Sequence, residues 1–351
     1  MFVLLGEKNL PVGELQASGF PVQVIEQRPG SSWRCSRRLV RVFERERVDL
    51  VHVHQATSWL FGAMARLHYR RPPILLTEHE RGYPDFPPLK RVAAIRVLLE
   101  RRDRIVAVSH TVRRSLILNE GLPPERVAVI YHGIAPLPAA AAHVGDSVRQ
   151  EIGVGSDMYL ILQVARLDLS QNHAIALRAL EQVVRSVPRT RLALVGEGPE
   201  QGIVRELVRR HGLESHVLFL GLRTDYHRLM AAADVVLLTS LSEDLPLALV
   251  YALAAGRPVV AIRAGSVGEV VVNRRSGLLA CPNDDDSLTE NLLLLCKQPD
   301  LRARLGREAL ERAERMFSEA AMAQSYHAMY REMLGQGHDE SGPETAIMVR
   351  R

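Results

Sequence analysis

Short apolar runs alternate with helix-like segments along the first part of the chain. Six such runs are FVLLGE from residue 2, VQVIEQ from 22, LVHVHQ from 50, PILLTE from 73, RIVAVS from 104 and VAVIYHG from 127. Apolar strands that alternate with amphipathic helices are typical of a parallel sheet covered on both faces. Residues 1–140 are therefore predicted to form a doubly wound α/β domain.

A second alternation of the same kind follows. Its apolar runs are LILQVAR from residue 160, RLALVGEGP from 191, VLFLG from 217, VVLLTS from 235, PVVAI from 258 and GLLA from 277. We expect a second α/β domain at residues 141–316, joined to the first by a linker within Ala135 to Ser147, which is rich in Ala and Pro. The segment from Leu301 to Leu334 is strongly helical, with a break at Met316-Phe317-Ser318, and we expect a last helix at 317–334. The polar tail 335–351 is expected to be disordered.

Composition indicates a globular protein of ordinary make-up. The 351 residues are 47% hydrophobic and 24% charged, and no apolar run approaches the roughly 18 residues of a membrane span. Met1 to Leu10 lacks the pattern of a signal peptide, so a cytoplasmic location is expected. Cys35, Cys281 and Cys296 show no paired spacing, and the sequence predicts neither a disulfide framework nor a metal site.

The net positive charge is concentrated in residues 1–140, and much of it lies on two candidate helices at 34–47 and 89–102. These are either solvated helix faces or a surface for anionic lipid or an anionic acceptor at the inner face of the cell membrane. Nucleic-acid binding is not predicted, because no aromatic residues alternate with the basic ones.

The segment SLSEDLPLALVYALAAGRPVVA, residues 240–261, has the parts of a ligand site. An acidic turn that carries Glu243 precedes an apolar helix, a Gly-Arg-Pro stop and a buried strand. The N-terminus of a helix suits a phosphate, and a carboxylate beside it suits sugar hydroxyls. The alternative is that Glu243 caps the helix and that the leucines and valines after it form a core face, Leu247, Leu249, Val250 and Leu253.

This segment resembles the Glu-x7-Glu motif of retaining glycosyltransferases of family 4, which have the GT-B fold. Glu243 matches the first glutamate, which contacts the transferred sugar, and Tyr251 stands where the second would take the ribose hydroxyls. VARLDLSQNH resembles the family's Gly-Arg-Leu-x3-Lys-Gly segment; Arg166 matches the arginine that pairs with the diphosphate, and Gln171 replaces the lysine. Only three of the 45 Lys and Arg side chains are lysines. A general preference for arginine over lysine would therefore have placed Arg, and not Gln, at position 171.

The resemblance implies further site residues. GEGP at Gly196 matches a glycine turn, and the turn before Arg223 matches the segment that holds the nucleotide base. Glu269 matches the glutamate of the Gly-Gly-x-Pro-Glu loop. The implied donor-binding set is Arg166, Gln171, Gly196, Leu222, Glu243, Leu247, Ala248, Tyr251 and Glu269.

In the first half, LTEHERGYPD resembles the family's Thr-Glu-His-Gly segment, whose histidine lies near the reacting sugar. This makes His79 a candidate, with Glu78 as the residue that orients it; a structural histidine is the alternative. The implied catalytic residues are then His79, Glu243 and Arg166. Ser109, His110 and His132 follow neighbouring strands and are further candidates.

The family implies two Rossmann-like domains that face a cleft and transfer of a hexose from a UDP- or GDP-linked donor to a saccharide or lipid-linked acceptor, with no cofactor. The chain begins at the family's second strand, so we expect the first, central strand of the N-terminal domain to be missing. The alternative is a non-catalytic homologue that binds a partner or nucleotide sugar without turnover. Three features favour it: Gln171, Tyr251 and this missing strand. An epimerase or phosphorylase is a further alternative.

Overall fold

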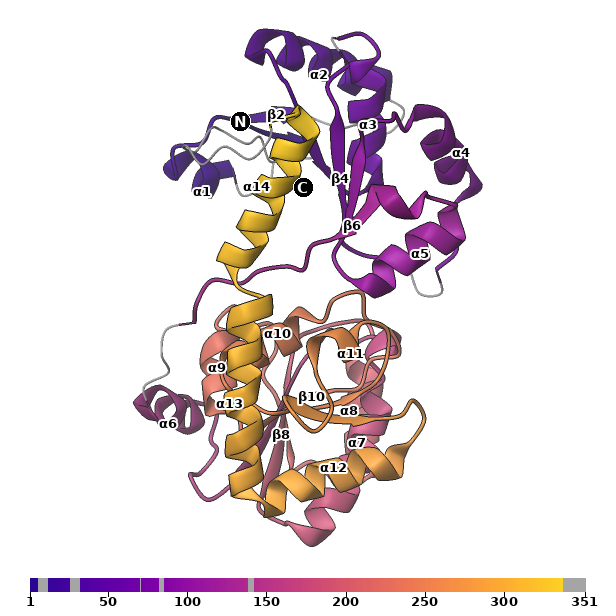
Figure 1. Cartoon of the computed structure of the whole chain (residues 1–351). Coiled ribbons are helices and arrows are strands. Elements are labelled where there is room, and N and C mark those ends of the chain that lie inside the picture. Colours follow the sequence, from indigo (N-terminus) through magenta and orange to yellow (C-terminus); the bar gives the residue numbers. More distant parts are fainter. Residues whose placement is uncertain (6–11, 26–31, 70, 82–84, 138–141, 337–351) are drawn as a thin grey trace. The chain divides into compact units, whose positions relative to one another are not determined.

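The computed structural model describes residues 1–5, 12–25, 32–69, 71–81, 85–137 and 142–336 (Figure 1). The predicted disordered tail lies outside the described residues from 337 onward. The chain divides into two compact units: unit 1 is Met1–Ile130 with Ala323–Arg351, and unit 2 is Tyr131–Met322. Among the described residues, no helix is both long enough and apolar enough to cross a bilayer.

Unit 1 contains all six strands that the apolar runs predicted. They are β1 (Phe2–Leu5), β2 (Val22–Ile25), β3 (Val51–His54), β4 (Ile74–Glu78), β5 (Arg104–Ala107) and β6 (Val127–Val129). Between them lie α1 (Val12–Ala17), α2 (Ser32–Glu46), α3 (Ala56–Arg66), α4 (Leu89–Leu98), α5 (His110–Glu120) and a short 3-10 turn, Pro124–Arg126. The predicted helix at 89–102 ends earlier, at Leu98.

The strands of unit 1 form two separate parallel sheets. One sheet pairs β1 with β2, and the other has the order β3-β4-β5-β6. In the described residues, no strand pairing joins β1 to β3.

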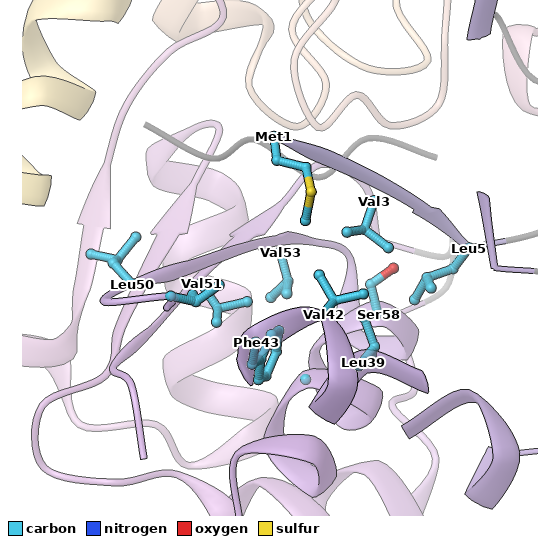
Figure 2. Close-up of a pocket in the computed structure, with 12 residues that line it drawn as sticks. Met1, Val3, Leu5, Leu39, Val42, Phe43, Leu50, Val51, Val53 and Ser58 are labelled. Carbon is cyan, nitrogen blue, oxygen red and sulfur yellow. The ribbon is translucent and has the colours of Figure 1, made fainter. Parts of the chain in front are cut away.

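An apolar groove lies where β1 and β3 approach α2 and α3 (Figure 2). Val3 and Leu5 reach it from alternate positions of β1, and Met1 just before that strand does so too. Val51 and Val53 reach it from β3. Leu39, Val42 and Phe43 close it from α2. The cavity in this groove measures about 30 Å³, so the packing of unit 1 is incomplete at this point.

Unit 2 contains the six strands of the second alternation. They are β7 (Tyr159–Val164), β8 (Thr190–Val195), β9 (Val217–Phe219), β10 (Val235–Leu238), β11 (Val259–Ile262) and β12 (Gly277–Ala280). The helices are α6 (Ala142–Glu151), α7 (His173–Ser186), α8 (Gln201–Arg210), α9 (Tyr226–Ala232), α10 (Leu247–Ala254), α11 (Val267–Val270), α12 (Asp285–Lys297) and α13 (Pro299–Met316). The predicted linker is wrong at its end, since residues 142–147 already belong to α6.

The sheet of unit 2 is parallel throughout, with the order β9-β8-β7-β10-β11-β12. This is the doubly wound order 3-2-1-4-5-6, in which the direction of winding reverses at the central pair, here β7 and β10. Ligands of such sheets bind at the carboxyl ends of the strands near that reversal. The topology therefore points to the loops after β7 and β10.

The last helix, α14 (Glu319–Leu334), follows the predicted break after α13. The break has a physical cause: the Ile134 N–H donates to the Phe317 carbonyl, and the Glu319 N–H donates to the Ile134 carbonyl, at 2.9 and 3.0 Å. These bonds replace bonds within a continuous helix. From Ala323 the helix belongs to unit 1, where the Tyr326 and Tyr330 hydroxyls bond to side chains of the sheet.

Because the groove of unit 1 is incompletely packed, an added methyl group there should stabilise the unit. Val53→Ile extends a side chain into open space and is expected to raise the free energy of unfolding of unit 1 by about 0.5–1 kcal/mol. Val260→Ile, in the fully buried core of unit 2, is the matched control and is expected to cost about 1–3 kcal/mol. Hydrogen exchange of the β3 and β11 amides reads each unit separately. Destabilisation by both changes would show that the groove is already filled.

Candidate functional site

Glycines allow the loops after β7, β8 and β9 to touch through their backbones. Gly196 has φ of 136°, and a Cβ there would lie 2.1 Å from the Ala165 carbonyl oxygen. The Gly196 N–H donates to the Gly221 carbonyl at 2.8 Å. The sequence-predicted GEGP turn thus holds the Arg166 loop and the Leu222 turn at one edge of the sheet.

Two candidate side chains of this edge project into solvent. The Arg166 side chain is 76% exposed, and its Nε lies 3.4 Å from an oxygen of Asp168. Leu222 is 75% exposed and follows Gly221, which has φ of 64°. An exposed guanidinium with one loose ion pair is available to an anionic ligand at little cost in lost contacts.

Gln171 ends a short 3-10 turn, Leu169–Gln171, and contacts the loop after β10. Its side-chain oxygen accepts a hydrogen bond from Ser240 Oγ at 2.9 Å, and its backbone carbonyl accepts one from Thr239 Oγ1 at 2.8 Å. Its amide nitrogen lies 3.5 Å from Glu243 Oε1, a long hydrogen bond. The structure therefore brings Gln171 and Glu243 together, and it does so at the strand pair where the sheet reverses.

Glu243 is largely shielded from water and is not a helix cap. Burial raises the pKa of its carboxyl group, and hydrogen bonds from Ser240 and Gln171 oppose that rise. The N-cap of α10 is Pro246, with no side-chain capping bond. The structure thus contradicts the reading of Glu243 as a cap, and Glu243 is held by neutral donors that stabilise its charged form.

The backbone of Glu243 is clamped by the loop after β11. The Ser266 N–H donates to the Glu243 carbonyl at 2.8 Å. Gly265 has φ of 52°, and a Cβ there would lie 2.2 Å from the Glu243 carbonyl oxygen. Only a glycine fits this approach, so the Gly265 loop sets the position of the acidic turn.

Glu269 follows this loop on α11 and is itself fixed. The Tyr131 hydroxyl donates to Glu269 Oε2 at 3.1 Å, and Arg312 donates to the Glu269 backbone carbonyl. Burial and the neighbouring Glu269 carboxylate raise the pKa of Tyr131 to about 12, so the phenol keeps its proton at neutral pH.

Helix α10 has one buried face and one accessible face. Leu249, Val250 and Leu253 are buried, as predicted for a core face, whereas Leu247 is 41% exposed and does not belong to it. Ala248 and Tyr251 are partly accessible.

Tyr251 packs edge-on against Tyr226, with ring centroids 4.7 Å apart. Burial and a hydrogen bond with Tyr226 raise the Tyr251 pKa to about 12. A protonated phenol therefore stands in place of the second carboxylate of the motif.

In unit 1, His79 directly follows β4, and its Nε2 lies 2.7 Å from Nδ1 of His54. Glu78 does not orient it: this buried carboxylate lies 2.6 Å from an Arg91 nitrogen, among Arg81 and Glu120. The prediction for Glu78 is wrong because neighbours along a strand point to opposite faces.

Ser109 is buried and caps α5 by accepting from the Val112 N–H, which is a structural role. His110 is the first residue of that helix, and His132 lies in unit 2 just after Tyr131. A role for either histidine in a ligand site stays a prediction.

Comparison with known proteins agrees with this architecture. A family model described as "Glycosyltransferase Family 4" matches residues 7–136, and one described as "Glycosyl transferases group 1" matches residues 146–312. The chain belongs to glycosyltransferase family 4. It is 25% identical over 317 residues to the N-acetyl-alpha-D-glucosaminyl L-malate synthase of Bacillus anthracis, covering 88% of this chain and 81% of that one.

Solved structures of the same fold extend over almost the whole chain. A glycosyltransferase from Rickettsia africae has a TM-score of 0.85 at 19% identity, covering 95% of this chain and 90% of that chain. Anabaena HepE in complex with UDP has a TM-score of 0.83 at 23% identity, covering 95% and 100%. These likenesses establish the GT-B fold.

Sequence reasoning missed three residues that contact the candidate residues: Ser240 and Tyr226 in unit 2, and His54 in unit 1. Ser240 and Tyr226 lie in other loops or helices, and only packing brings them to Gln171 and Tyr251. His54 did leave a signal, because LVHVHQ places two histidines two residues apart, on one face of an otherwise apolar strand.

The clamp on Glu243 predicts that Gly265 tolerates no side chain. Gly265→Ala adds a Cβ at a positive φ and against the Glu243 backbone, so it should lower the free energy of unfolding of unit 2 by at least ~1–2 kcal/mol. Gly268→Ala is the matched control, because a Cβ there meets nothing within 4 Å, and its effect should stay within about 0.5 kcal/mol. Urea unfolding of both variants measures this; equal effects would contradict a clamp specific to Gly265.

Proposed function

We propose that the protein transfers a hexose from a UDP- or GDP-linked donor to a saccharide or lipid-linked acceptor, with retention of anomeric configuration. The observation that carries this proposal is the contact of Glu243 with Gln171 and Ser240 at the reversal point of the unit 2 sheet. The loops after β7, β8 and β9 reach the same edge and bring Arg166, Gly196 and Leu222.

The parts of this edge suit the parts of a nucleotide sugar. Arg166 offers a mobile positive charge for the diphosphate, and the Leu222 turn offers backbone groups for the base. Glu243 offers a carboxylate for the sugar and for positive charge that develops in an oxocarbenium-like transition state. HepE, a protein of the same fold, has been solved with UDP and with UDP-glucose, which supports a nucleotide-sugar donor here. His79 of unit 1 is the proposed contact to the reacting sugar.

A thermal-shift panel of UDP, GDP, ADP and their sugar conjugates tests the donor site. Specific stabilisation by one nucleotide names the base, because a ligand that binds only the folded state raises its stability. No shift with any of them, from a protein that melts cooperatively, would overturn a donor site in unit 2.

Glu243→Gln separates transfer from binding. The change keeps the size of the side chain but removes its charge, so the transfer rate should fall by about 100-fold or more while nucleotide affinity changes little. Burial raises the Glu243 pKa, so the wild-type transfer rate should begin to fall, as the pH is lowered, at a pH above the usual pKa range of glutamate. The rate of Glu243→Gln should not show this fall. Glu206→Gln on the surface of α8 is the matched control. An unchanged rate in Glu243→Gln would exclude Glu243 from the reaction.

A second candidate is a homologue that binds a nucleotide sugar or a partner without turnover. The specific observation is that two charged groups of the motif are replaced by neutral ones, Gln171 and Tyr251. Gln171 removes a positive charge that would offset the leaving diphosphate, a loss of about 100-fold in rate. Nucleotide binding without sugar transfer would favour this candidate over the enzyme.

A contact with an anionic membrane is also part of the proposal, for the basic helices of unit 1. Apolar side chains on or beside α4 are unusually exposed: Phe86 is 83%, Leu89 85% and Val97 81% exposed. Lys90 and Arg96 lie on the same helix. Exposed apolar groups among basic ones are typical of surfaces that bind lipid headgroups.

Vesicle sedimentation tests this contact. Leu89→Glu combined with Val97→Glu should reduce binding to phosphatidylserine vesicles about tenfold, since it removes apolar anchors and adds repulsion. Leu118→Glu on α5, also exposed, is the control. Equal binding of the wild-type protein to phosphatidylserine and neutral phosphatidylcholine vesicles would contradict the proposal. So would equal binding of the double variant and of Leu118→Glu to phosphatidylserine vesicles.

A further inference from the structure

Three histidine rings follow one another across two neighbouring strands of unit 1. His52 and His54 lie on the same face of β3, and His79 follows β4, which pairs with β3 in parallel. The ring centroids of His52 and His54 are 4.4 Å apart, and those of His54 and His79 are 4.9 Å apart. The strand pairing therefore stacks His54 between a buried ring and the proposed site residue.

His52 is a fixed and uncharged end of this stack. Its Nδ1 lies 2.7 Å from the Tyr330 hydroxyl, and its Nε2 lies 2.8 Å from Thr77 Oγ1. Burial, with a contribution from His79, lowers the pKa of His52 to about 3. Both nitrogens are engaged and the ring stays neutral at physiological pH, so His52 acts as a rigid platform under His54.

The contact between His54 and His79 restricts both rings. Their facing nitrogens, Nδ1 of His54 and Nε2 of His79, are 2.7 Å apart. At this distance one nitrogen carries the proton and the other accepts it, because two facing N–H groups would repel. The tautomers of the two rings are therefore coupled, and further contacts of His79 are made from its Nδ1 side.

Polar groups of neighbouring elements also lie beside the stack. From β4 and its loop come Thr77 and Glu80, the latter reached by the Gln55 amide at 3.4 Å. From α14 come Tyr326 and Tyr330, whose pKa values are raised by burial.

We propose that His54 is a positioning residue for His79: it fixes the tautomer and the ring orientation of His79 through the bond between Nδ1 and Nε2. The proposal deepens the proposed transferase function, on which its kinetic arm rests. His79 would contact the substrate, whereas His54 would act only through His79. This is the role that sequence reasoning gave to Glu78.

Two substitutions distinguish the effect of the hydrogen bond between His54 and His79 from the effect of the volume of the His54 ring. His54→Asn places an amide near the position of Nδ1 and can still donate or accept, whereas His54→Leu fills similar space without a polar atom. His327→Leu, on the exposed side of α14, is the control for losing a histidine elsewhere in unit 1. Melting temperatures of all three show whether each variant is folded.

The first readout needs no activity. Nitrogen-15 NMR of the histidine side chains reports which ring nitrogen carries the proton. We expect wild type, His54→Asn and His327→Leu to show one tautomer of His79, and folded His54→Leu to show a mixture. The same single tautomer of His79 in His54→Leu would overturn the proposal.

The second readout is transfer kinetics with the donor identified by the nucleotide panel. His54→Leu should lower kcat by about tenfold to 100-fold, because a displaced side chain in an ordered site costs that much. The donor KM should stay within about threefold, and His54→Asn should recover most of the rate. A kcat for His54→Leu equal to that of wild type would contradict a positioning role. If wild type transfers no sugar, the proposed function fails and the NMR result alone decides the role of His54.

Discussion

Close backbone contact at the carboxyl edge of a parallel sheet is the constraint on which unit 2 depends. Parallel strands send all their following loops to one edge, and the loops can meet there only if side chains do not intervene. Gly196 and Gly265 satisfy this condition, since a Cβ at either position would overlap a neighbouring carbonyl oxygen. The contacts fix the Arg166 loop and the Glu243 turn without using any functional side chain.

Around Glu243 the protein uses neutral hydrogen-bond donors where the family motif has a lysine. Gln171 and Ser240 stabilise the carboxylate, yet burial still raises its pKa. A lysine would have favoured the charged form more strongly, because an opposite charge acts over a longer range than a dipole. This edge therefore carries less positive charge than the family motif implies.

Unit 1 shows how a sheet in two pieces can still order a polar stack. Its β1 and β3 strands border an apolar groove, and β3 and the residue just after β4 carry the three histidines. Tyr326 and Tyr330 of α14 bond to Thr77 and His52 of these strands. These bonds satisfy polar groups that are costly to leave unpaired in a buried place.

The sequence by itself determined the strands, the parallel α/β class and the family. Each apolar run is short, continuous and bounded by polar residues, and such a pattern has few structural solutions. It also placed Arg166, Gly196 and His79 just after strands, and Glu243 in the loop that follows β10.

Tertiary structure alone decided which side chains meet. Gln171 meets Glu243 across two loops separated by about seventy residues, and Tyr226 meets Tyr251 across two helices. Neither pairing leaves a local pattern, since loop conformations depend on packing. His54 replaced Glu78 as the partner of His79 for a simple reason: pairing between strands brings together residues on one face, while adjacent residues along a strand point to opposite faces.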